Sequence, residues 1–470
     1  MSAYSSNKMG AHAIVLGASM AGLLAARVLS DHFECVTLIE RDRLPDGPDN
    51  RKGVPQGRHT HGLLAKGQSI LSQLFPDLVP ALIESGAVTG ELAADAKWYH
   101  FGGYKIRFHS GLFGVTMSRA FLEYHVRQRV LALKNIRLIQ DCDVKGLIAT
   151  DLNARIVGVK FQQRAAGSIE EALTADLVVD ATGRGSASPK WLESLGYPRP
   201  EETAIKIDVG YTSRIYRRAP GDVKGAQFLL TYPTPPREKR MGVMFPIEGD
   251  RWSMLLGGWH GDHAPTDEQG FLTFARSLPT PDIYNVIKRA EPLSDVFVHK
   301  FPSNLRRRYE KMARVPEGYI VLGDALCSVN PVYGQGMTIS ALDAITLDQS
   351  LKDQRQQRGD LRGLSRRFFK DVSKVIDMPW MLTAGEDFRY PETTGPKAPG
   401  TDLINAYVAK VHAAVQRDPV VYYAFIEVMN LIQPPTLMFN PKIAWRVLRA
   451  ARTVRREAAL PIQRALEGAQ

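Results

Sequence analysis

A glycine-rich turn near the start of the sequence has residue types that could hold the phosphates of a dinucleotide. An apolar run, Ala13–Leu16, precedes it and a helix-like run, Leu23–Leu29, follows. A second apolar run, Val36–Ile39, ends at an acid, Glu40. This order of strand, turn, helix, strand and acid is typical of a dinucleotide-binding βαβ unit, in which N–H groups at the helix N-terminus face the pyrophosphate. The turn consists of Gly17, Ala18, Ser19, Met20, Ala21 and Gly22.

The residues of this unit differ in what they contribute. Gly17 permits the tight turn, Gly22 allows helix and strand to pack closely, and Ser19 is small but adds crowding where the motif has a second glycine. Glu40 is placed to accept hydrogen bonds from a ribose. An acid there disfavours a 2′-phosphate, so the site suits FAD or NAD better than NADP. Glu40 and the adjoining Arg41 are our candidates for the adenosine end. The alternative interpretation is a tight turn without a ligand.

A second glycine-rich loop follows in the C-terminal half, after the strand-like run Glu317–Leu322. Gly323 and Asp324 end this strand, and a helix-like run, Thr338–Leu347, lies beyond the loop. Glycines let a backbone approach a flat ring closely, and the helix N-terminus stabilises negative charge on that ring. The alternative is again a turn that binds nothing. The loop residues that we select are Pro331, Gly334, Gln335, Gly336 and Met337.

With these two motifs, far apart in the sequence, the chain resembles the single-component FAD-dependent monooxygenases of the aromatic-hydroxylase type. The resemblance implies that Asp324 accepts a hydrogen bond from a ribitol hydroxyl of FAD, and that the second loop faces the pyrimidine edge of the flavin. It also implies that Arg119, in Met117–Leu122, lies against the FAD phosphates or the flavin edge, and that the backbone of Val144 contacts adenine. A solvated helix arginine is the alternative interpretation of Arg119.

The segment Arg51–Leu64 is similar to a stretch found in a bacterial subgroup of this family that includes proposed epoxidases of polyether biosynthesis. In that subgroup the stretch reaches the flavin. The resemblance therefore makes Arg58, His59 and His61, together with Pro331, the candidates for residues near the reacting ring, and Arg58 and His59 candidates for contacts to FAD. Two histidines two positions apart could also suggest a metal, but no third ligand of matching type lies nearby, so we expect no metal site.

One departure from the family concerns the electron donor. Members usually carry Asp-Gly-x-x-Ser after a strand, a motif linked to NAD(P)H handling. This chain keeps Gly183 and Ser186 but has Thr182 in place of the Asp, while Asp180 lies two residues earlier and need not substitute for it. No second dinucleotide motif follows. We therefore expect NAD(P)H to bind transiently, and the sequence leaves NADH and NADPH open.

The positions of these motifs predict an α/β fold with a discontinuous FAD-binding domain of the Rossmann-like, glutathione-reductase type. We assign residues 10–84, 113–196 and 303–350 to it, residues 85–112 and 197–302 to an antiparallel β-sheet substrate domain, and residues 351–470 to a helical C-terminal region. Alternating and aromatic runs predict the strands of the substrate domain and a substrate wall, although aromatic residues at strand spacing also build cores. The runs are Trp98–Phe101, Gln227–Tyr232, Met241–Phe245 and Arg251–Leu256.

Composition narrows the class of protein. The chain has 470 residues, of which 44% are hydrophobic and 23% charged, as in ordinary folded proteins, and no apolar run approaches the length of a membrane-spanning helix. The net charge of +11 could indicate nucleic acid, an anionic cofactor or a membrane surface, but no nucleic-acid-binding motif occurs, so we expect no nucleic-acid partner. Three cysteines without a C-x-x-C pair, and a polar N-terminus without a secretory signal, predict a cytoplasmic protein.

The segment Pro441–Arg456 has the pattern of a basic amphipathic helix, with Ile443, Val447 and Leu448 on one face. Another face carries Arg449, Arg452 and Arg456. Such a helix can make peripheral contact with an anionic membrane. More often it packs on its own domain and leaves the charged face in solvent, which is the interpretation we favour.

The resemblance implies an FAD-dependent monooxygenase. NAD(P)H would reduce the flavin, O2 would add at its C4a atom, and the resulting hydroperoxide would transfer one oxygen to a small hydrophobic secondary-metabolite substrate. The sequence shows no acid–base pair, which favours epoxidation of an alkene or polyene over hydroxylation of an aromatic ring. The alternatives are an aromatic-ring hydroxylase, an FAD-dependent reductase or dehydrogenase that saturates isoprenoid chains, and a non-catalytic flavin-binding sensor. A flavin-dependent halogenase is disfavoured because no Trp-x-Trp-x-Ile-Pro motif occurs.

Overall fold

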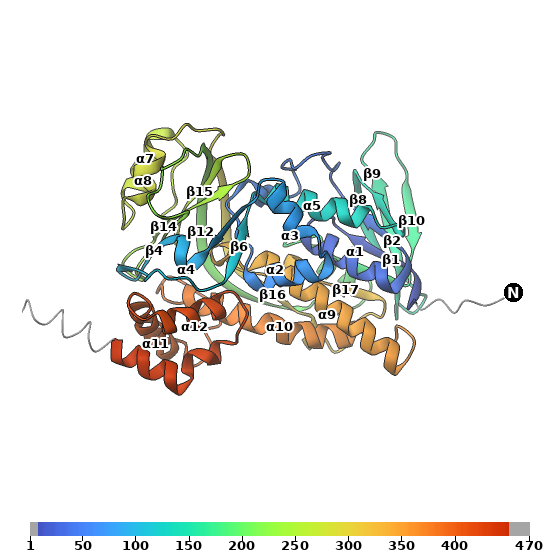
Figure 1. The fold of residues 1–470 in the computed structure, drawn as a ribbon. Coiled ribbons are helices and arrows are strands. Elements are labelled where there is room, and N and C mark those ends of the chain that lie inside the picture. The colour runs from blue at the N-terminus through green and yellow to red at the C-terminus, as the bar shows by residue number, and fades with distance from the viewer. Residues whose placement is uncertain (1–7, 451–470) are drawn as a thin grey trace, which may run out of the picture.

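The computed structural model describes residues 8–450, which form two β-sheet bodies joined by long helices (Figure 1). A parallel sheet with helix α1 (Met20–His32) lies at one end of the molecule and a large antiparallel sheet lies at the other. Helices α9 (Gly336–Gln357) and α10 (Leu364–Asp387) run below both in this view. Helices α11 (Thr401–Ala414) and α12 (Pro419–Met429) lie below the antiparallel sheet.

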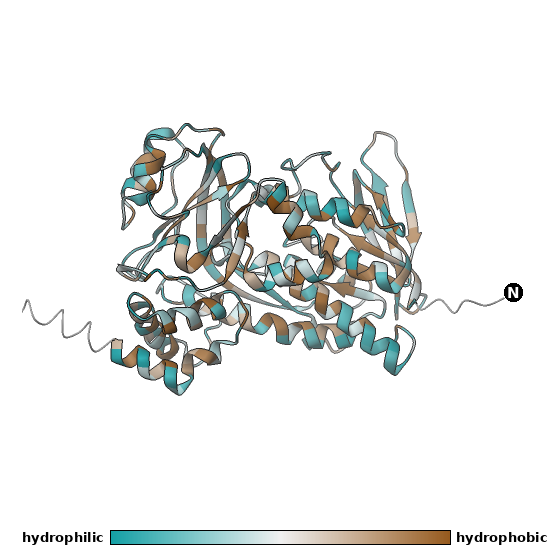
Figure 2. Cartoon of the chain, viewed as in Figure 1, coloured by the Kyte–Doolittle hydropathy of each residue, from teal (hydrophilic) through white to brown (hydrophobic). Residues whose placement is uncertain are grey.

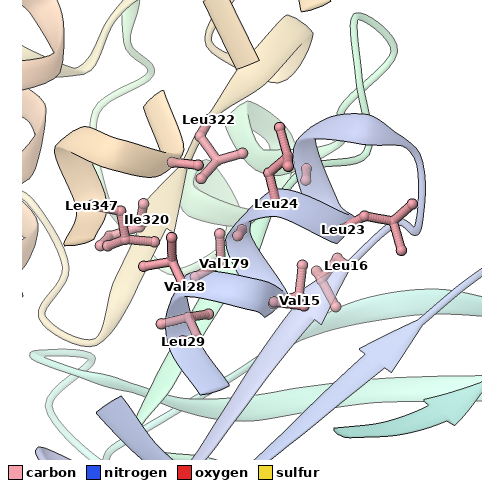
Figure 3. Packing of buried hydrophobic residues seen from close by; sticks show 14 of the residues in the cluster. Val15, Leu16, Leu23, Leu24, Val28, Leu29, Val179, Ile320, Leu322 and Leu347 are labelled. Atoms are coloured by element: carbon pink, nitrogen blue, oxygen red, sulfur yellow. The ribbon is translucent and has the colours of Figure 1, made fainter. Parts of the chain in front are cut away.

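The first body is built on a five-stranded parallel sheet with the order β17-β11-β1-β2-β7. Its central strands are apolar runs that are almost wholly buried, as parallel strands covered on both faces require. Figure 3 shows Leu24 and Val28 of α1 packed among strand residues such as Val179 and beside Leu347 of α9. The strands are β1 (Gly10–Leu16), β2 (Phe33–Ile39), β7 (Ile136–Ile139), β11 (Leu177–Asp180) and β17 (Tyr319–Val321).

The second body is an eight-stranded sheet with the order β18-β16-β12-β15-β14-β13-β4-β5, in which only the β13–β4 pair is parallel. Because successive side chains of a strand alternate between faces, the sheet packs Trp252 against helices α7 and α8 and presents Trp98 and Trp259 on the face toward α11 and α12. The strands are β4 (Ala96–His100), β5 (Gly103–Tyr104), β12 (Glu201–Arg217), β13 (Phe228–Thr231), β14 (Arg240–Ile247), β15 (Arg251–Gly258), β16 (Phe297–Arg308) and β18 (Cys327–Ser328).

Smaller elements complete both bodies, and Figure 2 shows hydrophobic and hydrophilic positions alternating along the helices that flank the sheets. Two small antiparallel sheets consist of β8 (Cys142–Ala149), β9 (Ile156–Gln163) and β10 (Glu170–Thr174), and of β3 (Val88–Glu91) and β6 (Phe113–Thr116). The other α-helices are α2 (Ala65–Leu74), α3 (Leu78–Glu84), α4 (Leu92–Asp95), α5 (Arg119–Leu131), α6 (Ser188–Ser194), α7 (Glu268–Arg276) and α8 (Asp282–Ile287). Within residues 8–450 the short 3-10 helices are η1 (Pro55–Arg58), η2 (Tyr309–Lys311), η3 (Gly323–Ala325), η4 (Pro331–Tyr333) and η5 (Pro435–Phe439).

The structure confirms the predicted fold class and the strand runs that were read from the sequence. The division into domains stays a prediction. One strand crosses the expected boundary at residues 302 and 303, because β16 continues to Arg308 and pairs with β18. The large sheet therefore draws on residues that the sequence assigned to the FAD-binding part.

The end of the described chain is helical from residue 441 to residue 450. Ile443 and Val447 are buried there, as expected, but Leu448 is 45% exposed, so its assignment to the packed face is wrong. The expected arginines Arg452 and Arg456 lie outside the described residues. Among residues 8–450, no helix combines the length and apolar character that crossing a bilayer requires.

The close packing of α1 against the turn before it can be tested by substitution. A Cβ atom on Gly22 would lie 1.8 Å from the carbonyl oxygen of Gly17, which is backbone and cannot move aside. We expect Gly22→Ala to lower the free energy of unfolding by roughly 2 to 3 kcal/mol, measured by urea denaturation. The control Gly146→Ala, whose Cβ meets no atom within 4 Å, should change it by less than about 0.5 kcal/mol. Equal stability of the two variants would contradict this packing.

Candidate active site

One large cavity of about 1020 Å³ lies where the two bodies and the C-terminal helices meet. Its walls come from the α1 turn, the loop after β2, the aromatic face of the large sheet, the loop before α9, and helices α10 to α12. Most of the lining is apolar, with a few charged and polar side chains among it. An apolar cavity with a small number of convergent polar groups is the usual form of a cofactor or small-molecule site.

The α1 turn has the backbone geometry that the sequence predicted. Gly17 has a φ of +93°, and its position beside Ala181 leaves no room for a side chain. Ser19, Met20 and Ala21 line the cavity, so the N-terminus of the 13-residue helix α1 opens onto it. An anion at this end would be stabilised by the free N–H groups and the helix dipole. The other turn residues, Gly17, Ala18 and Gly22, support the turn from behind without lining the cavity.

The predicted adenosine end lies beside this turn. The carboxylate of Glu40 accepts hydrogen bonds from the backbone N–H of Ala18 at 2.6 Å and of Asp42 at 2.9 Å. The strand that carries Val144 is also close, because Cys142 N–H donates to the backbone oxygen of Glu40 at 3.2 Å. Glu40, Val144 and the exposed Arg41 lie outside the main cavity. The structure thus brings Glu40 and the start of β8 together at one edge of the α1 turn.

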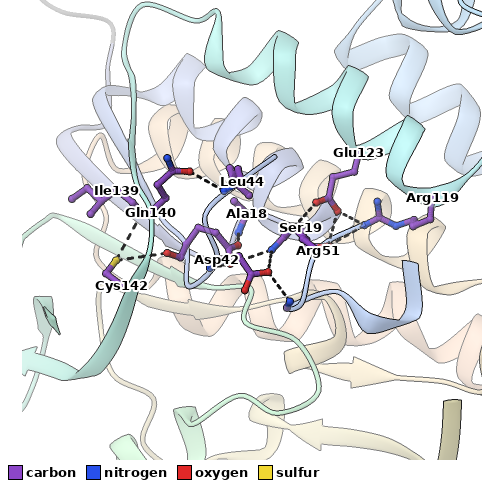
Figure 4. A network of polar contacts seen from close by, with 12 residues as sticks. Ala18, Ser19, Asp42, Leu44, Arg51, Arg119, Glu123, Ile139, Gln140 and Cys142 are labelled. Atoms are coloured by element: carbon purple, nitrogen blue, oxygen red, sulfur yellow. Dashed lines mark hydrogen bonds and ion pairs between the residues drawn. The ribbon is translucent and has the colours of Figure 1, made fainter. Parts of the chain in front are cut away.

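A ring of buried charges joins three segments behind the turn (Figure 4). Glu123 on α5 pairs with Arg51 Nε at 2.8 Å and with Arg119 Nη2 at 2.8 Å. Arg51 also reaches Glu40 at 3.1 Å, and Arg119 donates to Ser19 Oγ at 2.9 Å. Burial disfavours the charged form of Glu123, but the two arginines outweigh it and hold its pKa below the ordinary value. The ring therefore fixes two guanidinium groups beside the N-terminus of α1.

Each of these two arginines keeps one buried nitrogen without a hydrogen-bond partner among the described residues, Nη2 of Arg51 and Nη1 of Arg119. A buried unsatisfied donor on a charged group is costly, so such atoms mark places that a ligand can satisfy. The chemistry that fits two unsatisfied guanidinium donors at a helix N-terminus is that of an anionic phosphate or diphosphate.

Asp324 follows β17 and lies near the α1 turn, since a Cβ on the preceding Gly323 would lie 2.7 Å from Cβ of Ala21. Gly323, with a φ of +63°, turns the chain so that the Asp324 side chain lines the cavity. Its carboxylate accepts no hydrogen bond from any described residue. Burial raises the pKa of Asp324 to about 6, and the charges of Arg184 and Arg119 oppose this shift. A carboxylate with unused lone pairs at this place fits a ligand that offers hydroxyl groups.

The loop before α9 has open space in front of its glycines. Gly334 adopts a φ of +68°, and a Cβ on Gly336 would meet no atom within 4 Å. Pro331, Gln335 and Met337 line the same wall of the cavity. A flat ring with hydrogen-bonding edges can therefore approach this backbone closely.

A buried carboxylate holds that loop in place. Asp387, at the end of α10, is 0% exposed and accepts hydrogen bonds from Asn330 Nδ2 at 2.8 Å, Tyr333 OH at 3.0 Å and Asn304 Nδ2 at 2.7 Å. Burial raises the pKa of Asp387 to about 6 despite these donors. The hydrogen bonds tie the α9 loop to β16 and to the C-terminal helices.

The histidine-bearing loop lies against the large sheet. His59 Nδ1 is 2.9 Å from Ser213 Oγ on β12, and His61 Nδ1 donates to the backbone oxygen of His59 at 2.9 Å. Both rings line the cavity. Burial is the main cause that lowers the pKa of His59 to about 3 and of His61 to about 4. Both imidazoles are therefore neutral at neutral pH, and His61 presents an acceptor nitrogen, Nε2.

The structure does not bring Arg58 to the cavity. Its side chain is exposed and its guanidinium lies over the ring of Phe297 at 4.7 Å. The reason is local: Pro55–Arg58 forms a 3-10 turn whose last residue faces outward, whereas His59 returns to extended backbone and enters the interior. Within residues 8–450, no group of three metal-ligating side chains occurs.

Asp180 has a structural role in the loop that departs from the family pattern. Its buried carboxylate accepts hydrogen bonds from Thr182 N–H at 2.8 Å, from Thr182 Oγ1 at 2.6 Å, and from the hydroxyls of Ser186 and Ser188. Asp180 therefore shapes the loop from inside, while Thr182 and Gly183 line the cavity.

Sequence reasoning missed several residues that shape the site. Arg51 opens the segment Arg51–Leu64, but no local pattern in the sequence points to its role. Glu123 could have been found, because it lies four residues after Arg119 on a helix, which is the spacing of an intrahelical ion pair. Arg184, whose Nη2 donates to Ser303 Oγ at 2.9 Å, and Asp387 carry no local signal.

Comparisons with known proteins show the fold and one relative. No protein-family model matches the chain. Protein Rv3254 of Mycobacterium tuberculosis is 32% identical over 435 residues, which cover 90% of each chain.

Solved structures share the architecture at low sequence identity. The flavin-dependent brominase Bmp2 superposes with a TM-score of 0.64 and 12% identity, over 95% of this chain and 100% of its own. CmlS, a flavin-dependent halogenase, superposes with a TM-score of 0.63 and 17% sequence identity, over 87% of this chain and 73% of its own. PqsL, described as a probable FAD-dependent monooxygenase from Pseudomonas aeruginosa, superposes with a TM-score of 0.58 and 17% sequence identity. The match covers 80% of this chain and 97% of PqsL. At these identities the likeness shows the fold.

The hydrogen bonds of Asp387 generate a prediction. Asp387→Asn places an N–H group opposite the donors Asn304 and Asn330, which leaves buried groups unsatisfied. We expect the free energy of unfolding to fall by about 2 kcal/mol at pH 8, where the aspartate is ionised, measured by urea denaturation. The control Asp371→Asn removes a half-exposed partner of Lys374 on the same helix and should cost less than about 0.5 kcal/mol. Two equally stable variants would show that Asp387 does not hold the loop.

Proposed function

The chain belongs to the same family as Protein Rv3254 of Mycobacterium tuberculosis, and we propose that it is an FAD-dependent monooxygenase that acts on a small hydrophobic substrate. The observation that carries the proposal is the continuity of the cavity. One space extends from the N-terminus of α1, past Arg119 and Asp324 and the glycines before α9, to the aromatic face of the large sheet. A dinucleotide with a flat redox ring and an apolar substrate can share such a space.

The fit to FAD rests on groups of complementary chemistry. Arg119 and the N-terminus of α1 would hold the phosphates, with Arg51 behind them, because both guanidinium groups retain unsatisfied donors. Asp324 would accept from the ribitol hydroxyls, since nothing in the described chain uses its carboxylate. Glu40 would accept from the ribose, and the backbone at Val144 would lie near adenine.

FAD, when bound and reduced, would supply the activation of O2 and the transfer of one oxygen atom. The chain's own residues would place the ring and keep water away from it. The loop from Gly334 to Met337 would let the ring approach the N-terminus of α9, whose dipole favours negative charge there. His59 and His61, held neutral by burial, would offer polar contacts without adding charge beside the ring. The aromatic wall would exclude water from the substrate side.

We propose NAD(P)H as a transient electron donor and the reducing cytoplasm as the compartment. The engagement of Asp180 with its own loop supports transient binding, because the acid nearest to the family's NAD(P)H motif is already satisfied. Epoxidation of an alkene or polyene remains our proposal for the reaction, with aromatic hydroxylation as the alternative within the same chemistry.

The reaction type is tested by oxygen labelling. The purified yellow protein is supplied with NADPH or NADH and 18O2, together with a panel of polyenes and phenols, and products are read by mass spectrometry. One labelled oxygen atom per product molecule supports a monooxygenase. Reduced products without label would instead show an FAD-dependent reductase, and a chain that takes up no FAD would refute the proposal.

The role of Asp324 gives a direct prediction. We expect Asp324→Ala to weaken FAD binding by about tenfold or more, because a ribitol hydroxyl loses a charged acceptor. Flavin retention after gel filtration and titration of the apoprotein with FAD would measure this. Asp353→Ala on α9 is the control, since its carboxylate accepts a hydrogen bond from Gln349 on the same helix, away from the cavity. Wild-type affinity in the Asp324 variant would remove this residue from the site.

The role of Arg119 is tested against another arginine of the same helix. We expect Arg119→Ala to raise the dissociation constant for FAD by roughly 10- to 100-fold, because the phosphates lose a buried cationic donor. Arg129→Ala removes a guanidinium whose partner is the exposed Asp77, and it should bind FAD like the wild type. If both variants bind FAD equally well, Arg119 serves only to pair with Glu123.

A further inference from the structure

A buried lysine sits in an aromatic cage beside the substrate part of the cavity. Lys105 follows β5 and is 4% exposed. Its Nζ lies 4.3 Å from the ring centroid of Trp98, 4.4 Å from that of Phe425 and 5.7 Å from that of Tyr422. Aromatic faces attract a cation at these distances. The aromatic cage of Trp98, Tyr422 and Phe425 thus holds an ammonium group where water does not reach it.

The ammonium is linked to the cavity through a histidine. Lys105 Nζ lies 3.4 Å from Nδ1 of His412 on α11, and this is the hydrogen bond of the ammonium group within the described chain. A protonated lysine can only donate, so Nδ1 must accept, and a neutral His412 carries its proton on Nε2. Burial holds the pKa of His412 well below its ordinary value, with the charges of Lys105 and Arg389 acting in the same direction. His412 lines the cavity, and Nε2 bonds to no described residue. The Nε2–H group of His412, polarised by the ammonium of Lys105, can therefore donate a hydrogen bond to a ligand in the cavity.

A second histidine in the same wall has an unsatisfied atom. The ring of His100 lies 4.4 Å from the ring of His412, and its Nδ1 is buried without a hydrogen-bond partner among residues 8–450. Burial also holds the pKa of His100 well below the ordinary value. Because a buried polar atom without a partner costs free energy, this atom is an independent sign that a polar ligand group belongs here.

The electrostatic balance of the cluster favours a negative ligand group. The other charged residues that face it, Glu386 and Arg389, form an ion pair with each other at 2.7 Å. Burial lowers the pKa of Lys105 to about 7, and Glu386 opposes the shift. The cluster of Lys105, His100 and His412 therefore carries one positive charge when Lys105 is protonated, and no described carboxylate pairs with it.

The cluster lies close to the loop that we assign to the flavin. The ring of Tyr232 is 5.3 Å from that of His100, and Tyr232 OH donates to the backbone oxygen of Val332 in η4 at 3.1 Å. One tyrosine therefore spans from the cluster to the loop. The cavity wall around it is apolar and includes Leu230 and Met241. A molecule bound here would have its polar end at the histidines and its apolar body along the sheet.

We propose that the substrate is an apolar molecule with one anionic oxygen, a carboxylate, phenolate or enolate, which accepts the Nε2–H of His412 while Lys105 positions and polarises that histidine. The inference rests on the proposed function in taking this cavity as the substrate site. The cluster also bears on the reaction type, because the sequence favours epoxidation over hydroxylation only through the lack of a visible acid–base pair. Lys105, hydrogen-bonded to the neutral His412, is a titratable group that the sequence could not reveal.

The test compares two probes that differ in charge but share shape. 2-Naphthoate carries the anionic oxygen, and 2-naphthamide is its neutral analogue. We expect the wild type to bind naphthoate about tenfold more tightly than the amide at pH 6, measured by calorimetry or by quenching of tryptophan fluorescence. Lys105→Met should remove this preference and leave amide binding unchanged. His412→Phe, which keeps the ring packing but lacks the donor, should do the same. The control Lys97→Met alters a lysine paired with Asp282 outside the cage and should keep the preference.

The pH dependence of the preference for naphthoate distinguishes a charged positioning role of Lys105 from a role in packing alone. In the wild type the preference for naphthoate should decline as the pH rises above about 7, because Lys105 loses its proton there while His100 and His412 stay neutral. The profile of Lys105→Met should be flat. Equal affinity of the wild type for both probes, or a preference that survives in both variants, would overturn the proposal. A chain that binds no FAD but shows this Lys105-dependent preference would refute the proposed function alone.

Discussion

Taking a charge out of water costs several kcal/mol unless a partner compensates it, and this chain buries many charges around one cavity. Glu123 is compensated by two arginines, and Asp387 by side-chain donors from two separate segments. The buried polar atoms that these contacts leave unsatisfied indicate where a ligand can bind. Unsatisfied atoms of Arg51, Arg119 and His100 lie near or along the same space, as does the unused carboxylate of Asp324. Several of the polar atoms that the described residues leave unsatisfied are thus gathered at the proposed ligand site.

The two buried carboxylates also connect the layers of the fold. Glu123 joins α5, the α1 turn and the loop after β2, which fixes the phosphate end of the site. Asp387 joins α10, the loop before α9 and β16, which fixes the other end. One anchor lies beside the parallel sheet and the other beside the large antiparallel sheet, and both sheets pack near the long helices α9 and α10 (Figure 1). A cofactor that bridges them would depend on both anchors.

Sequence patterns reached the fold and the backbone turns but missed most of the long-range pairs. The α1 turn and the glycines before α9 were predictable because glycine conformation is a local property. Glu123 had a helical spacing that could have been used. Asp387 and Asn304 are separated by 83 residues and Lys105 and His412 by 307, so no local pattern joins them. Arg58 lies outside the cavity for a local reason, since it ends a 3-10 turn and its side chain is exposed.

The proposed function requires one molecule of FAD to lie along the cavity in a single direction. A crystal structure of the chain with FAD tests this most directly. We expect one FAD per chain, with its phosphates at Arg119 and the N-terminus of α1, its ribitol at Asp324 and its ring at the glycines before α9. Density for no flavin, or for a flavin ring at Arg119 with the adenine at Gly336, would contradict it.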